Sequence, residues 1–527
     1  MSTTATSERP TPSPLTLAEA TALRADLADW TVDAVASVLG ERATAALTRE
    51  QILPALRQAR AAGDEPIAVL TRLLMLGDTV TRAQADAALR AVGVVGAQRV
   101  GLIEAAGEGA DDAVRSLVDV RPYAAADGAV EHTWWVASDV SEAVTGRQLA
   151  DDHVLGIGGA STTLASATIR RPVGRVLDLG TGSGIQALHA STHAREVVAT
   201  DISTRALGFA AFNRDLNQPR APWQLRQGSL LEPVAGEQFD LVVSNPPFVI
   251  SPANAPHFEY RDGGLGGDGI VATLITTLGA VLTVGGTAQM LGNWEIRHGD
   301  GWTHRLEQWL AAAAAAGHHL DAWIIQRDVL DTAEYAETWL RDAGVTPQRD
   351  RAGFEAAYAA YLDDFDSRGV SAVGFGMVLL RRSGSGPTLR RLEEHAGMLP
   401  TPLGPHLGAA LDAHDWLARH DDDAVLAQRW HVASDVTQES YGRPGQEHPQ
   451  HVLLRQGGAL GRSIKADTAL AGFVGASDGE LTGAQIAAAL AALLEVPVEQ
   501  MRSGLALAVR ELVMDGLLYR EGTRPSV

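Results

Sequence analysis

The feature that most constrains the fold is a regular alternation of apolar, strand-like runs with helical stretches between residues 150 and 382. The strand-like runs lie at residues 175–179, 196–201, 223–227, 239–244, 287–294, 320–326 and 373–380. Helical patterns such as 204–217, 301–315 and 332–343 fall between them. Strands and helices that alternate at this spacing form a parallel sheet with helices on both faces. The sequence therefore predicts an α/β domain with a seven-stranded, Rossmann-like sheet.

Length and local composition indicate further domains around this sheet. A chain of 527 residues is longer than one hydrophobic core supports, so about three domains are expected. Residues 1–15 are rich in Ser, Thr and Pro and predict a disordered tail. Residues 16–149 predict a mainly helical accessory domain, and the Gly/Ser-rich residues 383–388 predict a linker. Residues 389–527 predict a C-terminal α+β domain whose last helices and strand are compatible with a winged helix.

Residue types that are absent or scarce exclude several classes of chemistry. The chain contains no cysteine, which rules out disulfides and a cysteine nucleophile and favours a cytoplasmic location. The adjacent His318 and His319 would point apart in a helix or strand, so we expect no metal site. Glycines break the apolar stretch 274–291, so we expect no membrane span. A formal net charge of -21 argues against non-specific binding to nucleic acid.

One short segment occurs twice. Val-Ala-Ser-Asp-Val at residues 136–140 recurs at residues 432–436, and Gly-Arg follows each copy after a short interval. The repeat indicates either two related accessory modules or a coincidence in a chain rich in Ala, Val and Asp. Two copies are too few for a solenoid.

A glycine-rich turn after the first expected strand is a candidate ligand site. Asp178 lies near the end of that strand, two residues before a Gly-x-Gly-x-Gly run. Glycine allows positive φ and lets a ligand approach the backbone closely. The residues of this turn that we expect to contact a cofactor are Asp178, Gly180, Thr181, Gly182 and Gly184. Such turns also bind dinucleotides, so the motif alone leaves a nicotinamide cofactor open.

The ends of the next two expected strands add to this site. Asp201 ends the second strand, and an acid at that place accepts hydrogen bonds from ribose hydroxyls. Ile202 follows it directly. Ser229 and Leu230 follow the third strand, where the edge of an adenine ring would lie. The three strand ends together therefore predict a site for a nucleoside-containing cofactor.

The segment Asn245, Pro246, Pro247 and Phe248 ends the fourth expected strand and predicts the catalytic site. The side-chain oxygen of Asn245 and the carbonyl of Pro246 can accept both N–H bonds of a planar NH₂ group. Proline stiffens the loop, and Phe248 offers an aromatic face on which a flat amide or base can stack. The alternative is an ordinary turn after a strand, because these residues also favour turns. The segment counts against a nicotinamide cofactor.

Together these motifs resemble class I S-adenosylmethionine-dependent methyltransferases of the Asn-Pro-Pro-aromatic group, across residues 150–382. The resemblance implies S-adenosyl-L-methionine as cofactor, with Asn245 also contributing to its site. Within the group the chain is most similar to release-factor glutamine methyltransferases. Residues 228–234 match their third-strand loop, and residues 262–269 match their glycine- and acid-rich segment. Asn245 and Pro246 would then be the ligands of a substrate amide.

The resemblance leaves the methyl acceptor open. The Pro-Arg pair that the glutamine family usually carries before the first strand is absent, and residues 154–161 stand in its place. The favoured acceptor is a protein glutamine amide, and the alternative is an adenine amino group of RNA or DNA. Either reading predicts a macromolecular partner, with no membrane and no metal. A non-catalytic scaffold protein is a third hypothesis, which the intact Asn-Pro-Pro-Phe segment disfavours.

Overall fold

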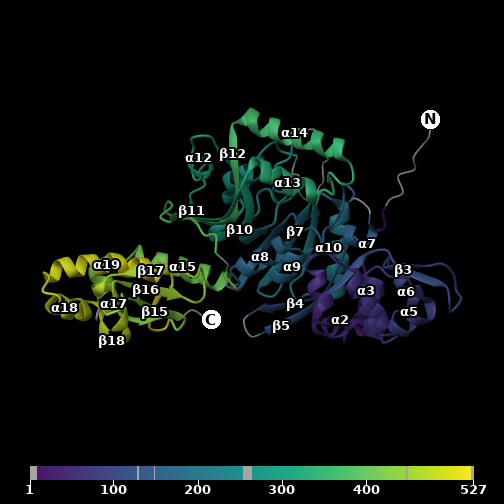
Figure 1. Ribbon diagram of the computed structural model, residues 1–527, viewed down its shortest axis with the longest axis horizontal. Helices are drawn as coiled ribbons and strands as arrows, with labels where there is room; N and C mark the ends of the chain where they lie inside the picture. Colours follow the sequence, from purple (N-terminus) through teal and green to yellow (C-terminus); the bar gives the residue numbers. More distant parts are fainter. Residues whose placement is uncertain are drawn as a thin grey trace. The chain divides into compact units, whose positions relative to one another are not determined.

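The computed structural model describes residues 9–127, 130–146, 149–252, 261, 264–397, 399, 402–445 and 449–523. The chain divides into two units (Figure 1). The first comprises Met1–Leu164, Pro172–Ile324 and Asp328–Pro387. The second comprises Ala165–Arg171, Ile325–Arg327 and Thr388–Val527. The domain boundaries expected from the sequence remain predictions.

A large mixed sheet forms the core of the first unit. Its strands are β6 (Val173–Leu179), β7 (Ala194–Asp201), β8 (Trp223–Gln227), β9 (Phe239–Ser244), β10 (Leu282–Arg297), β11 (Leu320–Asp331) and β12 (Val370–Arg382). Their order in the sheet is β11-β12-β10-β9-β6-β7-β8. The pairs β6/β7, β6/β9, β7/β8 and β9/β10 are parallel, whereas β10 and β12 are antiparallel. Each of the seven expected strands is therefore present.

The expected number of strands was nevertheless one too low. Among the described residues the sheet has eight strands, the last being β13 (Arg390–Glu394), which neighbours β11 in the sheet order. Gln326 of β11 belongs to the second unit, as β13 does. Its carbonyl accepts a 2.8 Å hydrogen bond from the His395 N–H, just after β13. The sequence of β13, Arg-Arg-Leu-Glu-Glu, has no apolar run that would have predicted a strand.

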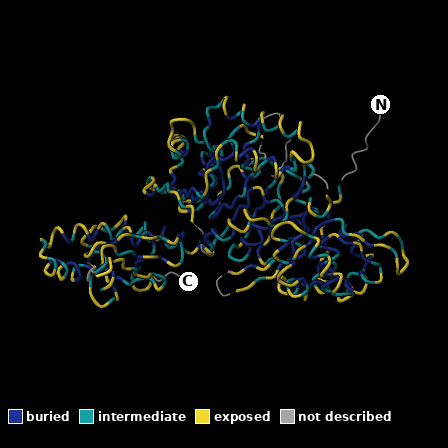
Figure 2. Tube along the Cα trace, in the orientation of Figure 1, coloured by how far each residue is buried: buried dark blue, intermediate teal, exposed yellow. Residues whose placement is uncertain are grey.

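Helices cover the central strands, which explains why β6, β7 and β9 each contain a buried apolar run. Val176, Leu177, Val197 and Val198 are fully buried, and Figure 2 shows buried segments at the centre of this unit. The helices of this part are α8 (Gly159–Ala167), α9 (Ile185–Ala190), α10 (Thr204–Asn217), α11 (Gly269–Thr277), α12 (His304–Ala315), α13 (Thr332–Asp342) and α14 (Arg351–Arg368). Burial on both faces is typical of strands in α/β sheets.

The N-terminal part of the first unit is helical at first and then adds β structure. Its helices are α1 (Leu17–Leu27), α2 (Val32–Leu47), α3 (Leu53–Ala61), α4 (Pro66–Leu70), the π-helical turn η1 (Thr71–Met75), α5 (Arg82–Ala88), α6 (Gly93–Arg99) and the short α7 (Glu142–Thr145). Its strands are β1 (Val80–Thr81), β2 (Ile103–Ala105) and β3 (Ala113–Ser116), in the order β1-β3-β2, and the hairpin β4 (Asp119–Asp127) and β5 (Val130–Ser138). The description "mainly helical" therefore holds only up to Arg99.

The second unit is α+β, as expected. Its helices are α15 (Gly404–Leu417), α16 (Asp422–Leu426), α17 (Thr468–Gly475), α18 (Gly483–Leu493) and α19 (Val498–Met514). Its further strands are β14 (Arg429–Val432), β15 (Val436–Tyr441), β16 (His451–Gln456), β17 (Ser463–Ala466), β18 (Asp478–Thr482) and β19 (Leu518–Arg520). They form two small sheets, β18-β14-β19 and β15-β16-β17. Trp430 and Phe473 are fully buried in its core.

The two units contain a similar succession of elements. In the first, a helix precedes β1, α5, α6 and β2, and β3 is the central strand of the sheet. In the second, α17 precedes β18, α18, α19 and β19, and β14 is the central strand. Thr81 and Thr482 cap the equivalent helices α5 and α18, each in a capping box with a Gln three residues later. The Val-Ala-Ser-Asp-Val repeat, for which the sequence left related modules and coincidence open, does not decide this: one copy begins within β5 of the hairpin and the other at the end of β14.

Among the described residues, we find no helix with the length and apolar character that a membrane span requires.

Candidate active site

The register of the sheet brings the two principal motifs to one edge. Leu179 at the end of β6 is the direct partner of Ser244 at the end of β9, and the two strands are parallel. Leu179 also pairs with Thr200 on β7. The Ser244 hydroxyl donates a 2.8 Å bond to the Leu179 carbonyl. The glycine turn and the Asn245 loop therefore leave neighbouring strands at the same level. In open α/β sheets this carboxyl edge is where ligands bind.

The glycine turn has the backbone that only glycine adopts readily. Gly180, Gly182 and Gly184 have φ of 73°, 55° and 88°. A Cβ added at Gly180 or Gly182 would meet nothing within 4 Å, whereas one at Gly184 would lie 3.1 Å from Trp223. The first two glycines therefore leave open space at the turn, and the third allows close packing. The N–H groups of Gly180 and Thr181 both donate to the Thr200 carbonyl at 2.9 Å.

Asp178 is a buried carboxyl group beneath this turn. Its Oδ2 accepts bonds from the Thr181 hydroxyl at 2.6 Å and from the Ala187 N–H at 2.9 Å. Its Oδ1 is buried and has no hydrogen-bond partner among the described residues. Burial raises the pKa of Asp178 to about 7, although both hydrogen bonds lower it. An unpartnered buried oxygen is costly, so this site suits a ligand that supplies a donor or a positive charge.

Asp201 ties the glycine turn to the second strand. Its Oδ2 accepts the Gly182 N–H and its Oδ1 accepts the Ser203 N–H, both at 2.9 Å. A carboxylate oxygen can accept more than one hydrogen bond, so ligand hydroxyls can still bind here. Ile202, next to it, is 60% exposed and offers an apolar surface at the same edge.

Ser229 and Leu230 lie at the end of the neighbouring strand β8. Gln227, the last residue of β8, pairs with Asp201, and the Gly228 N–H donates to the Asp201 carbonyl at 3.0 Å. Ser229 and Leu230 are both half-buried. Leu230 has φ of 47°, a left-handed conformation that is unusual for leucine. The predicted cofactor residues thus lie along three adjacent strand ends, β6, β7 and β8.

The predicted catalytic segment follows β9 directly. Pro246 is buried, and Asn245, Pro247 and Phe248 are half-buried. The Oδ1 atom of Asn245 is buried and has no hydrogen-bond partner among the described residues. A buried amide oxygen in this state can accept a hydrogen bond from a substrate N–H group at little cost.

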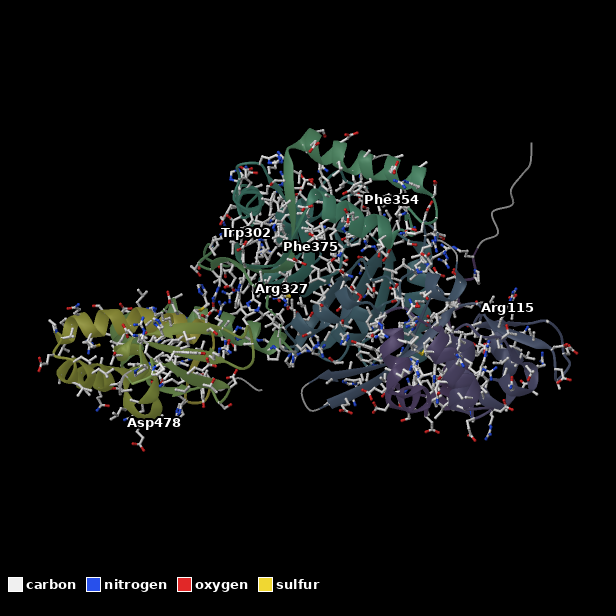
Figure 3. The ribbon with its side chains drawn as sticks, viewed as in Figure 1. Arg115, Trp302, Arg327, Phe354, Phe375 and Asp478 are labelled. Atoms are coloured by element: carbon white, nitrogen blue, oxygen red, sulfur yellow. The ribbon has the colours of Figure 1, made fainter. Side chains whose placement is uncertain are left out.

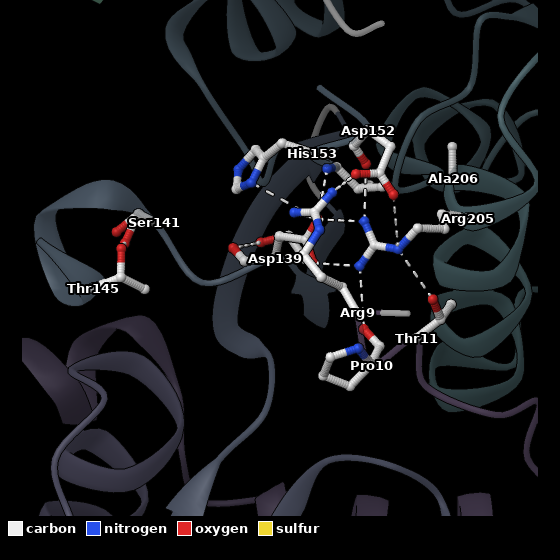
Figure 4. A network of polar contacts seen from close by, with 12 residues as sticks. Arg9, Pro10, Thr11, Asp139, Ser141, Thr145, Asp152, His153, Arg205 and Ala206 are labelled. Atoms are coloured by element: carbon white, nitrogen blue, oxygen red, sulfur yellow. Dashed lines mark hydrogen bonds and ion pairs between the residues drawn. The ribbon is translucent and has the colours of Figure 1, made fainter. Parts of the chain in front are cut away.

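A polar network that sequence reasoning missed holds the start of α10 next to Asp201 (Figure 4). The Arg205 guanidinium donates to both oxygens of Asp139 at 2.7 Å and to the Asp152 carbonyl at 2.8 Å. Asp139 also accepts the Val154 N–H at 2.8 Å. Burial lowers the pKa of His153, which lies 3.7 Å from Asp139. The network fixes the beginning of the 154–161 loop. The only sequence feature that pointed to this region was that these residues replace the Pro-Arg pair of the glutamine family.

Two asparagines of α10, which sequence reasoning also missed, pair with the edge of β5. Asn217 accepts the Trp135 N–H at 3.0 Å and donates to the Trp135 carbonyl at 2.8 Å. Asn213 makes the same two bonds with Ala137, at 2.7 and 2.9 Å. The side-chain amides therefore make the backbone hydrogen bonds that a neighbouring strand would otherwise make with β5. Nothing in the sequence distinguishes these asparagines from ordinary polar helix positions.

Two residues of the glycine- and acid-rich segment 262–269, Asp262 and Gly263, lie outside the described residues. Asp268 is described and is only 4% exposed. It accepts the Glu295 N–H at 2.9 Å and the Arg305 Nε–H at 2.7 Å. Asp268 thus anchors the end of this segment to β10 and α12. Among the described residues, no group of three or more His, Asp or Glu side chains could hold a metal ion.

Comparison with known proteins assigns two parts of the chain. Residues 156–259 match the family described as "Methyltransferase small domain", and residues 27–116 match a "Domain of unknown function (DUF7059)". The release factor glutamine methyltransferase of Xylella fastidiosa is 38% identical over 133 residues, 23% of this chain and 47% of that protein. The ribosomal protein uL3 glutamine methyltransferase of Bradyrhizobium diazoefficiens is 34% identical over 139 residues, 24% and 42% of the two chains.

A relative that acts on RNA, by its name, also matches. Ribosomal RNA small subunit methyltransferase C of Pasteurella multocida is 35% identical over 88 residues, 16% of this chain and 26% of that protein. Among solved structures, the 16S rRNA N2 G1207 methyltransferase of T. Thermophilus aligns with a TM-score of 0.25 and 16% identity, covering 49% of this chain and 65% of that one. The chain spans less than half the length of the curated relatives named here.

Residues 156–259, which contain strands β6 to β9 of the sheet, therefore match a methyltransferase small domain. The resemblance inferred from the motifs is confirmed at this level, because a methyltransferase family matches residues 156–259 and relatives named for release-factor and ribosomal-protein methylation also match the chain.

Proposed function

We propose that this protein is an S-adenosylmethionine-dependent N-methyltransferase that methylates a planar NH₂ group. The observation that carries the proposal is the pairing of Leu179 with Ser244, since it places the glycine turn and the Asn245 loop side by side. The methyltransferase small domain at residues 156–259 supports it.

The residues of the glycine turn suit the methionine half of the cofactor. The unpartnered Oδ1 of Asp178 can accept a donor, and Gly180 and Gly182 leave open space beside Thr181. Asp201 would accept the ribose hydroxyls, and Ile202, Ser229 and Leu230 would contact the adenine ring. Bound S-adenosylmethionine supplies a methyl group already activated by its sulfonium.

The chain's own residues would prepare the acceptor nitrogen. An amide or exocyclic amino nitrogen is a poor nucleophile because its lone pair is delocalised. The Asn245 Oδ1 and the Pro246 carbonyl would accept its two N–H bonds, and Phe248 would stack on its flat group. With the acceptor held in this way, the nitrogen would be placed to form an N–C bond with the methyl carbon as the carbon–sulfur bond breaks and S-adenosylhomocysteine leaves. The nitrogen then loses a proton to solvent, so no metal or covalent nucleophile is needed.

A protein glutamine amide is the favoured acceptor. Two of the relatives reported above are named for glutamine methylation. A net charge of -21 also suits a protein substrate better than a polyphosphate. The second candidate is an amino group of a nucleic-acid base, which the match to a ribosomal RNA methyltransferase favours.

The flanking modules would grip this macromolecular substrate. Both contain a helix–strand–helix–helix–strand succession beside a central strand, which resembles a winged helix, but the central strand β3 follows this succession whereas β14 precedes it. Winged-helix domains bind proteins as well as nucleic acids, so the likeness does not choose between the two acceptors.

Transfer of radiolabelled methyl groups from S-adenosylmethionine into extract tests the proposal. The purified protein should label a protease-sensitive product, and the Asn245→Ala variant should label none. Label that is mainly nuclease-sensitive would contradict the glutamine assignment and favour the second candidate. Absence of any label, with no binding of S-adenosylmethionine, would contradict the whole proposal.

A further inference from the structure

Helices α13 and α14, which lie between β11 and β12, contact the segment that follows the predicted catalytic residues. The two helices pack side by side, as their green ribbons show (Figure 1). Ile250, five residues after Asn245, is fully buried in an apolar cluster with side chains of both helices. The other fully or nearly fully buried members of that cluster are Tyr335, Ala336, Leu340, Tyr361, Phe365, Val370 and Val373.

The Tyr335 hydroxyl is the main polar contact within this cluster. It accepts the Ile250 N–H at 2.8 Å and an N–H of the Asn293 side chain at 2.9 Å. Tyr335 is fully buried, and its ring meets Phe365 edge-on at 5.6 Å. Phe375 of β12, labelled in Figure 3, lies 5.6 Å from the same ring. One phenol therefore joins α13 to strand β10 and to the segment after Phe248.

Two further contacts join the same segment to the same helices. The Ser251 and Tyr361 hydroxyls lie 3.1 Å apart, so one donates to the other. The Arg261 guanidinium is 4% exposed and donates to the Trp339 carbonyl and to Asp342, both at 3.1 Å. The Val249 N–H donates to the Arg261 carbonyl at 2.9 Å. Residues 249–251 and Arg261 are thus attached to α13 and α14 at several independent points.

We propose that α13 and α14 position the Asn245 loop for methyl transfer and that Tyr335 is the positioning residue. The inference rests on the function proposed above. Tyr335 lies behind the loop, attached at Ile250, and acts through the backbone rather than on the acceptor. Apart from Asn245, the residues expected to contact the cofactor lie at the ends of β6, β7 and β8, on the other side of β9 from β10. Loss of the Tyr335 hydroxyl should therefore impair transfer and spare cofactor binding.

The Tyr335→Phe variant tests this, with Tyr358→Phe as the matched control. Tyr358 also lies on the helical pair, but its hydroxyl donates to Glu337 at the surface, at 3.0 Å. Tyr335→Phe should lower kcat about 10- to 100-fold, because small misplacements of reacting groups cost about that much. Its affinity for S-adenosylmethionine should stay within about twofold of the parent protein, as the cofactor site lies on other strands. Tyr358→Phe should match the parent protein in both measurements.

A second measurement does not need the methyl acceptor. Hydrogen exchange of a peptide covering residues 245–252 should quicken in Tyr335→Phe and stay unchanged in Tyr358→Phe. Unchanged exchange together with unchanged kcat would overturn the inference. A parallel loss of cofactor affinity would also overturn it, since that marks general destabilisation. If the parent protein transfers no methyl group at all, the proposed function fails, and the exchange measurement still decides whether Tyr335 holds the loop.

Discussion

The side-chain amide of Asn213 donates a hydrogen bond to the carbonyl of Ser183 in the glycine turn, over 2.8 Å. The same amide pairs in both directions with Ala137 of β5. Asn213 is fully buried, and both of its N–H bonds and its oxygen are used. One side chain therefore connects the accessory hairpin to the turn expected to hold the cofactor.

Replacement of Asn213 by alanine should weaken cofactor binding by roughly tenfold and lower the free energy of unfolding by about 2–4 kcal/mol. The reason is that buried donors and acceptors on Ala137 and Ser183 would lose their partner. Asn217→Ala is the matched control, because among the described residues its side chain bonds Trp135 and the Asn213 carbonyl and does not reach the glycine turn. It should destabilise the protein comparably while cofactor affinity changes less. Calorimetry and thermal unfolding measure the two effects; equal affinity losses in both variants would contradict this role.

Asn245→Ala should reduce methyl transfer by about 10²- to 10³-fold, the usual effect of removing one preorganised polar group from a reacting centre. Binding of S-adenosylmethionine should largely survive, because the turn residues on β6 and β7 stay in place. Single-turnover assays and calorimetry separate the two effects. Full activity in this variant would remove the assigned role of the Asn245 oxygen.

Phe248→Ala should also lose activity through the lost stacking surface.

Asp201→Ala should weaken cofactor binding about 10- to 100-fold, since it removes both the ribose acceptor and the partner of the Gly182 N–H. Asp201→Asn keeps one acceptor oxygen and should lose less. Isothermal titration with S-adenosylmethionine checks that affinity falls from the parent protein to Asp201→Asn and then to Asp201→Ala. An affinity unaffected by either change would show that the cofactor does not use this carboxylate.

Asp178→Asn should make the free protein more stable at alkaline pH while weakening cofactor binding. The pKa of Asp178 rises from its ordinary 3.8 to about 7, chiefly through burial. Between those values the folded state holds a proton that the unfolded state releases, so stability falls as pH rises through this window. At pH 8 the charged form costs up to about 4 kcal/mol, at about 1.4 kcal/mol per pKa unit. Denaturant unfolding of both proteins between pH 5 and 8 measures this; identical pH profiles would contradict it.

Periodicity in the sequence predicted the central sheet well because its strands are buried on both faces. Most of them carry an apolar run that a sequence pattern can detect; β8, Trp-Gln-Leu-Arg-Gln, is the exception and is only partly buried. The motif residues at the ends of β6 and β9 were predictable for a related reason, since parallel strands place their carboxyl ends at one edge. The charged strand β13 lacked both signals.

The supporting contacts could not be predicted in this way. Asn213, Arg205 and Tyr335 act through partners that are distant in the chain, such as Ala137, Asp139 and Ile250. A polar residue in a helix pattern gives no indication of its partner, because exposed and buried amides have the same local sequence signal. The helical pattern near residues 332–343 was recognised, but its contact with the Asn245 loop depends on tertiary packing.

The hairpin β4–β5 contacts both helices that follow the glycine turn, because Tyr123 also bonds His189 of α9 at 3.0 Å, in addition to the bonds of β5 with α10. The part of the chain that matches a methyltransferase family begins only at residue 156. A fragment cut at that boundary would keep every motif and lose the hairpin that braces them. The faces of α9 and α10 that the hairpin buries would be exposed to solvent. Asn213 would lose its bonds to Ala137 and become a surface side chain. Evolutionary recombination or protein engineering that moves this catalytic sheet must therefore carry the preceding hairpin with it.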